Sequence, residues 1–71
     1  MYSNMGDYKK ALENYNNALA IRQKVLPENH PDIATTLNNI GMVYHDMGDY
    51  EKALENYNKS LAIDLQLLPE N

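Results

Sequence analysis

The sequence contains no cysteine, tryptophan or phenylalanine, and only three glycines and three prolines. The absence of cysteine excludes disulfides and thiolate metal sites, which stabilise many small secreted folds. This composition fits a reducing compartment, and we therefore expect a cytoplasmic location. A chain of 71 residues forms at most one small domain, because so short a chain buries only about 60% of its unfolded surface.

Basic residues are also scarce, since six Lys and Arg stand against ten Asp and Glu and give a formal net charge of -4. The basic residues are scattered along the chain, whereas a phosphate-binding surface needs them clustered. No apolar run approaches the roughly 18 to 20 residues of a membrane span, and the N-terminus lacks a basic segment followed by an apolar one. We expect neither nucleic acid nor a membrane as a partner.

The residue types that carry chemistry are present but are not arranged for it. His30 and His45 lie fifteen residues apart and have no carboxylate at ligand spacing, so no metal site is expected. The chain has no activated nucleophile, no glycine-rich phosphate loop and no paired carboxylates in an apolar setting. We therefore expect no enzyme activity, no cofactor and no metal.

The most informative feature that the sequence does contain is an internal repeat. The segment MGDYKKALENYN at residues 5–16 returns as MGDYEKALENYN at residues 47–58, with eleven of twelve residues identical at an offset of 42. When residues 1–29 are aligned with residues 43–71, 19 of 29 positions match, and both copies end in LPEN. Tandem repeats of this length are typical of arrays whose units bury their apolar faces against their neighbours.

A glycine followed by an aspartate occurs at the same place in both copies, at Gly6 and Asp7 and again at Gly48 and Asp49. Glycine adopts the left-handed conformation that ends a helix, and an aspartate can cap the helix that follows. We therefore expect each pair to separate two helices. Residues 1–5 are then the last turn of a helix whose beginning is missing.

Prolines set the other helix boundaries. Pro27 ends a helix, and Pro31 suits the first position of the next one, with His30 as its cap and Asp32 favourable to the helix dipole. Together with the glycine and aspartate pairs, these signals predict helices from about residue 8 to residue 26, from residue 31 to 47 and from residue 50 to about 67.

Apolar residues recur in these segments at the spacing of one helix face. A glycine within the second helix, Gly41, costs roughly 1 kcal/mol relative to alanine, and we expect it to allow close approach of the third helix near Ala53 or Tyr57. The expected buried positions are Ala11, Leu12, Tyr15, Ala18, Leu19 and Val25 or Leu26, then Ile33, Leu37, Ile40, Tyr44 and Met47, then Tyr50, Ala53, Leu54, Tyr57, Leu61 and Leu65.

Residues 34–63, ATTLNNIGMVYHDMGDYEKALENYNKSLAI, resemble a tetratricopeptide repeat. The family's usual period is about 34 residues, and the period of 42 in this chain is similar to that of the repeats of kinesin light chain, as is the segment HPDIATTLNNIG. The family pattern is carried by Leu37, Gly41, Tyr44, Gly48, Tyr50, Ala53, Tyr57 and Ser60, and its second half by Gly6, Tyr8, Ala11, Tyr15 and Ala18.

The resemblance implies an all-α fold in which three helices form antiparallel hairpins of a right-handed α-solenoid. In this reading residues 1–5 end a truncated first helix, residues 6–29 are the second helix and linker of one repeat, and residues 30–71 are one complete repeat. The chain is then a fragment of a longer array, because its stack is interrupted at both ends.

The resemblance also implies a scaffold for protein–protein interaction that holds peptides in a groove lined by the first helices of the repeats. An Asn side chain there suits the backbone of an extended peptide, although Asn can equally bridge helices or contact water. The carboxylate clamp of some family members needs Lys or Arg at such places, so that specificity is not expected. The implied groove residues are Thr35, Asn38, Asn39, Met42 and His45.

Self-association is the alternative function, because three helices fall short of the three repeats usually needed for stability. A homodimer or higher oligomer would cover the open apolar faces. End-to-end docking could grow into filaments, whereas exchange of helices between two chains would close into a symmetric dimer. The residues expected to associate are Leu12, Tyr15, Leu19, Tyr57 and Leu61.

Overall fold

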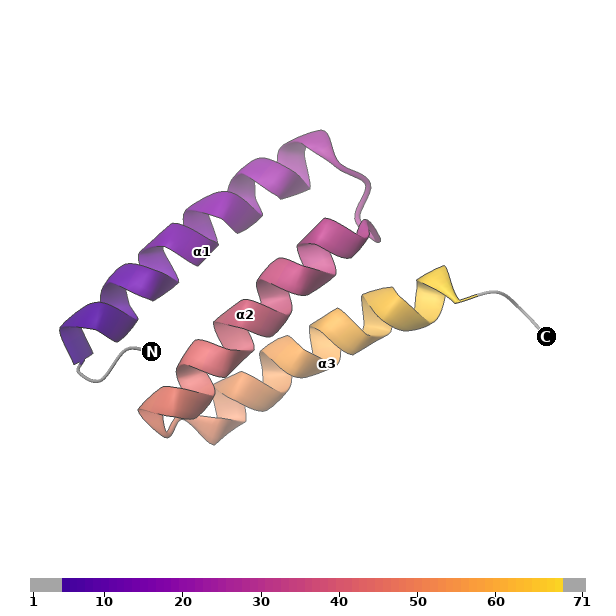
Figure 1. Ribbon diagram of the computed structural model, residues 1–71. Coiled ribbons are helices and arrows are strands. Elements are labelled where there is room, and N and C mark those ends of the chain that lie inside the picture. Colours follow the sequence, from indigo (N-terminus) through magenta and orange to yellow (C-terminus); the bar gives the residue numbers. More distant parts are fainter. Residues whose placement is uncertain (1–4, 69–71) are drawn as a thin grey trace.

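The computed structural model describes residues 5–68, which form the three helices α1 (Met5–Val25), α2 (Pro31–Met47) and α3 (Tyr50–Leu67). Consecutive helices run antiparallel, and α2 lies between α1 and α3 (Figure 1). The described residues include no strand, so the expected all-α hairpin fold is confirmed. The prediction of a helix end at residues 1–5 falls mostly outside the described residues, as do residues 69–71 of the predicted complete repeat.

The connector between α1 and α2 has the caps that the sequence predicts. Pro31 is the first residue of α2, and the Nδ1 atom of His30 accepts a hydrogen bond from the backbone N–H of Asp32 at 3.0 Å. The backbone N–H of His30 donates to the carbonyl of Pro27 at 3.0 Å. Proline has no N–H to leave unpaired at a helix start, and the histidine satisfies one of the free donors of the first turn.

The turn between α2 and α3 also follows the prediction. Gly48 has φ +87° and ψ +5°. Its N–H donates to the carbonyl of His45, and the N–H of Asp49 donates to the carbonyl of Tyr44. This pair of bonds closes a helix at a left-handed residue. Asp49 then caps α3 by accepting a hydrogen bond from the N–H of Lys52 at 3.3 Å. A single glycine therefore reverses the chain between two packed helices.

The equivalent prediction for the first copy of the repeat is wrong. Gly6 and Asp7 lie inside α1, which already includes Met5, and Gly48 is the only glycine with positive φ in the part of the chain that the structure describes. Glycine adopts negative φ about as readily as positive φ, so the residue type alone does not end a helix. Gly6 lies between the helical residues Met5 and Asp7 and continues α1.

Helix α2 forms the centre of the core because it has a neighbour on each side. Ile33, Leu37 and Ile40 are buried as expected, whereas Tyr44 and Met47 are only half-buried. Four further buried positions are not among the predicted ones, since the prediction assumes one buried stripe and the helix has two covered sides. They are Ala34, Thr36, Gly41 and Val43.

The expected close approach at Gly41 is confirmed. A Cβ atom at this position would lie 2.8 Å from two ring carbons of Tyr57 and 3.2 Å from the carbonyl oxygen of Ala53. Real Cβ atoms do not come so near their neighbours, so only glycine fits without a shift. The missing side chain lets the Tyr57 ring fill the space against α2 and brings the two helices together.

The predicted stripe of α1 is largely covered, whereas that of α3 is partly wrong. On α1, Ala11 is buried and Leu12 and Leu19 are half-buried. Of the two alternatives Val25 and Leu26, Leu26 is half-buried and Val25 is 72% exposed. On α3 the buried residues are Ala53 and Ser60, because α2 is the only described helix that contacts it. Four residues expected to be buried on α3 are exposed, namely Tyr50, Leu54, Leu61 and Leu65.

Candidate functional site

Four of the five predicted groove residues share the exposed side of α2. Thr35, Asn38, Met42 and His45 recur at intervals of three and four residues and are all exposed. They lie together because the opposite side of the helix is occupied by its contacts with α1 and α3. Asn39, the fifth, is half-buried. We call Thr35, Asn38, Met42 and His45 the α2 face.

The side chains of the α2 face keep much of their hydrogen-bonding capacity. The Thr35 hydroxyl donates to the carbonyl of Pro31 at 3.1 Å and retains its acceptor sites. The Nδ2 atom of Asn38 lies 3.9 Å from the Sδ atom of Met42, which is this amide's only hydrogen bond to another described residue. Thioether sulfur is a weak acceptor, so the amide remains available to a ligand.

His45 closes one end of the α2 face. Its ring packs edge-on against Tyr50, with 5.3 Å between ring centroids and 63° between planes, and its Nδ1 lies 3.8 Å from an Asp46 carboxylate oxygen. This contact joins the last turn of α2 to the first turn of α3. The His45 side chain is 60% exposed and remains accessible to a ligand.

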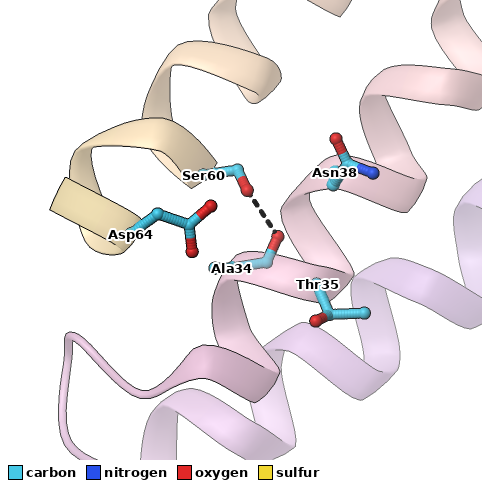
Figure 2. A pocket seen from close by; sticks show the side chains of 5 residues that line it. All are labelled: Ala34, Thr35, Asn38, Ser60 and Asp64. Carbon is cyan, nitrogen blue, oxygen red and sulfur yellow. Dashed lines mark hydrogen bonds between the residues drawn. The ribbon is translucent and has the colours of Figure 1, made fainter. Parts of the chain in front are cut away.

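A pocket of about 280 Å³ borders the α2 face on the side of α3. Figure 2 shows Asp64 extending from α3 toward α2, where Asn38 and Thr35 line the opposite wall. The Ser60 hydroxyl donates to the carbonyl oxygen of Ala34 at 2.8 Å and joins the helices at the floor of the pocket. Asp64 forms no ion pair or hydrogen bond with another described residue.

Asp64 is not among the functional residues that the sequence predicts. The alignment of the two repeat copies holds a usable signal, because Asp64 replaces Arg22 and so reverses the charge at that position. On α1, Arg22 donates from Nη1 to the hydroxyl of Thr36, which is buried in α2. The carboxylate of Asp64 instead opens onto the pocket.

A second hollow of about 290 Å³ lies on another side of the α2–α3 pair. Ile33 and Leu37 of α2 and Ile63 of α3 form its apolar walls, and Gln23 and Glu28 contribute from the end of α1 and the connector. None of the predicted site residues lines it.

The five residues predicted to self-associate are spread over two environments. Leu12, Tyr15, Leu19 and Tyr57 are half-buried within the chain, whereas Leu61 is 53% exposed. The exposed apolar surface of α3 therefore includes only one of the predicted residues.

The described residues contain no group of three or more His, Asp or Glu placed to hold a metal ion. Within residues 5–68, no helix is both long and apolar enough to cross a bilayer.

Comparison with known protein families matches residues 1–66 to the tetratricopeptide repeat. No curated protein and no solved structure matches the chain. The similarity to kinesin light chain thus stays a prediction. The matched residues include all of α2 and α3 up to residue 66, with the glycine contact at Gly41 and the left-handed turn at Gly48. The chain belongs to the tetratricopeptide repeat family.

Proposed function

We propose that the chain is a protein-interaction scaffold whose α2 face binds an extended segment of a partner protein. Repeats of this family commonly mediate protein–protein interaction and are typically non-catalytic. The observation that carries the proposal is that Thr35, Asn38, Met42 and His45 lie exposed along one side of α2. Such a surface combines amide, hydroxyl and imidazole groups for a peptide backbone with one flexible apolar side chain.

The pocket beside the α2 face is suited to a cationic side chain of the bound segment. Asp64 supplies a carboxylate without a described partner, and none of the residues that line the pocket is basic. A Lys or Arg ammonium or guanidinium group would form a charge-assisted hydrogen bond with it. The volume of about 280 Å³ leaves room for the end of one long side chain.

Selection of binders from a random peptide library on the immobilised chain tests this function. Affinities of the selected peptides are then measured by fluorescence anisotropy for the wild type, Asn38→Ala and Asp64→Asn. We expect each substitution to weaken binding about tenfold, the effect of one lost hydrogen bond of about 1.4 kcal/mol. Replacing the peptide's basic residue by Gln should remove the effect of Asp64→Asn.

Asn58→Ala is the matched control, because Asn58 is an exposed amide on α3 outside both the α2 face and the pocket. Selected peptides that lose affinity equally with Asn58→Ala and Asn38→Ala would contradict the proposal. If neither Asn38→Ala nor Asp64→Asn changed the affinity of the selected peptides, the binding site would lie elsewhere.

Self-association is the second candidate function. It is favoured by the exposed leucines of α3, since contiguous apolar surface on a small chain marks an interaction site. A homodimer or larger oligomer would remove this surface from water. Molar mass measured by light scattering over a dilution series tests it, and a folded monomer at every concentration would argue against it.

A further inference from the structure

Met42 is the one apolar residue of the α2 face, and solvent reaches it. It is 49% exposed, whereas Met47, the other methionine of α2, is half-buried. Oxidation of a methionine to its sulfoxide requires that the oxidant reach the sulfur. The exposed side of α2 gives Met42 that access.

The sulfur of Met42 lies beside a hydrogen-bond donor. The Nδ2 atom of Asn38 is 3.9 Å from Sδ, because residues four apart are neighbours on one side of a helix. Thioether sulfur is a weak acceptor, and the Asn38 amide has no other hydrogen bond to a described residue. The amide is therefore placed next to the sulfur but is only weakly held there.

Oxidation of the sulfur would turn this weak contact into an ordinary hydrogen bond. A sulfoxide is polar, and its oxygen accepts hydrogen bonds. An N–H···O bond is about 2.9 Å long, roughly 1 Å less than the distance from Nδ2 to Sδ. An oxygen on the side of the sulfur that faces Asn38 makes up this difference without a movement of the helix.

We propose that Met42 is a site of reversible oxidation, and that its sulfoxide holds the Asn38 amide and closes the α2 face to a bound segment. The α2 face then loses its one amide and its one apolar side chain together. The effect on binding rests on the proposed scaffold function, whereas the modification and the new hydrogen bond do not.

Hydrogen peroxide is the oxidant in this reaction. A lone pair of the Met42 sulfur attacks one peroxide oxygen, so that an S–O bond forms while the O–O bond breaks. The hydroxide that leaves takes up the proton of the transferred oxygen and is released as water. A methionine sulfoxide reductase reverses the change, with two thiols that become a disulfide and with release of the oxygen as water.

Peptide mapping by mass spectrometry during a time course in dilute hydrogen peroxide tests the site. We expect Met42 to be oxidised several times faster than Met47, because Met42 is exposed and Met47 is half-buried. Met47 is the matched control, since it lies on the same helix. Equal rates at the two methionines would overturn the assignment of the site to Met42.

Hydrogen exchange of the Asn38 side-chain amide, measured by NMR before and after oxidation, tests the new hydrogen bond. We expect this exchange to slow when Met42 is oxidised, because hydrogen bonding protects an N–H group from exchange with water. The Asn58 amide, which is exposed on α3, should exchange at an unchanged rate. Unchanged exchange at Asn38 after complete oxidation of Met42 would overturn the proposal.

The affinity of the library-selected peptides, measured before and after oxidation, tests the effect on binding. We expect oxidation to weaken binding to the wild type at least about tenfold, and a methionine sulfoxide reductase to restore it. Met42→Leu keeps the other three methionines, so peroxide should not change the affinity of this variant from its value before treatment. An equal loss on oxidation in Met42→Leu would assign the effect to another methionine and overturn the proposal.

The outcomes distinguish this inference from the proposed function. If no library peptide bound the chain before oxidation, the proposed function would fail, and the mapping and exchange measurements would decide the oxidation site. If peptides bound equally well before and after oxidation of Met42, the proposed function would stand and this inference would be overturned.

Discussion

Helices α1 and α3 share most of their sequence and contact the same central helix, yet they contact it with different sides. The leucines of α1 pack against α2, so that Leu19 is half-buried while Ile21 is exposed. Helix α3 does the reverse, since Leu61 is exposed while Ile63 is half-buried. The two isoleucines are equivalent in the repeat, and so are the two leucines.

The difference shows that one repeat sequence contains two packing faces. One face carries the leucines at the positions of Leu19 and Leu61, and the other carries the small residues Ala53 and Ser60 that let α3 approach α2. In an array each such helix has a neighbour on both faces. In the described chain each copy has only one face covered, and the uncovered faces are where association is proposed.

The largest effect is expected from breaking the tight contact between α2 and α3 at Gly41, which has no counterpart between α1 and α2 in the described chain. Gly41→Val should lower the free energy of unfolding by about 3 kcal/mol, because its side chain would overlap the Tyr57 ring and the Ala53 carbonyl. Urea denaturation followed by circular dichroism measures the change. When Gly41→Val is introduced into the Tyr57→Ala variant, it should cost much less than in the wild type, because the ring that it would overlap is absent.

Equal losses from Gly41→Val with and without the Tyr57→Ala substitution would mean that the ring does not limit this position. The contact would then have to be tight through the backbone of Ala53 alone.

A second, intermediate effect compares the two isoleucines. Ile63→Ala should cost about 1 to 2 kcal/mol, because Ile63 is half-buried and shares a hollow with Ile33 and Leu37 of α2. Ile21→Ala should change stability by less than about 0.5 kcal/mol, because Ile21 is exposed. Both are measured by urea denaturation at low protein concentration, where association contributes little. A loss at Ile21 as large as that at Ile63 would mean that the outer side of α1 is covered in solution.

The smallest effects are expected at the two equivalent glycines, where the same substitution should change stability in opposite directions. Gly48→Ala should destabilise the chain by about 1 kcal/mol, because Gly48 has φ +87° and a side chain is strained there even in open space. Gly6→Ala should stabilise it by about 0.5 kcal/mol, because Gly6 is helical and exposed.

Thermal unfolding of the two alanine variants provides the comparison. If both substitutions destabilised the protein, Gly6 would have to end a helix in solution as Gly48 does.

The sequence by itself determined the features that depend on neighbouring residues along the chain. His30 and Pro31 set the start of α2, and Gly48 and Asp49 set the turn before α3. Caps and turns of this kind are formed by side chains and backbone groups within a few residues, so their signals are readable without a fold. The exposed side of α2 is also predictable, because it is the complement of an apolar stripe of period 3.6.

Only the tertiary structure decided which side of each outer helix is covered. Periodicity marks residues that can be buried, but burial requires a second helix at the right place, and the near-identical helices α1 and α3 meet α2 in different ways. Likewise, the sequence around Gly6 repeats that around Gly48, yet Gly6 lies within α1. The tertiary structure also places Asp64 beside Asn38, because a pocket between two helices exists only once Gly41 and Ser60 have brought them together.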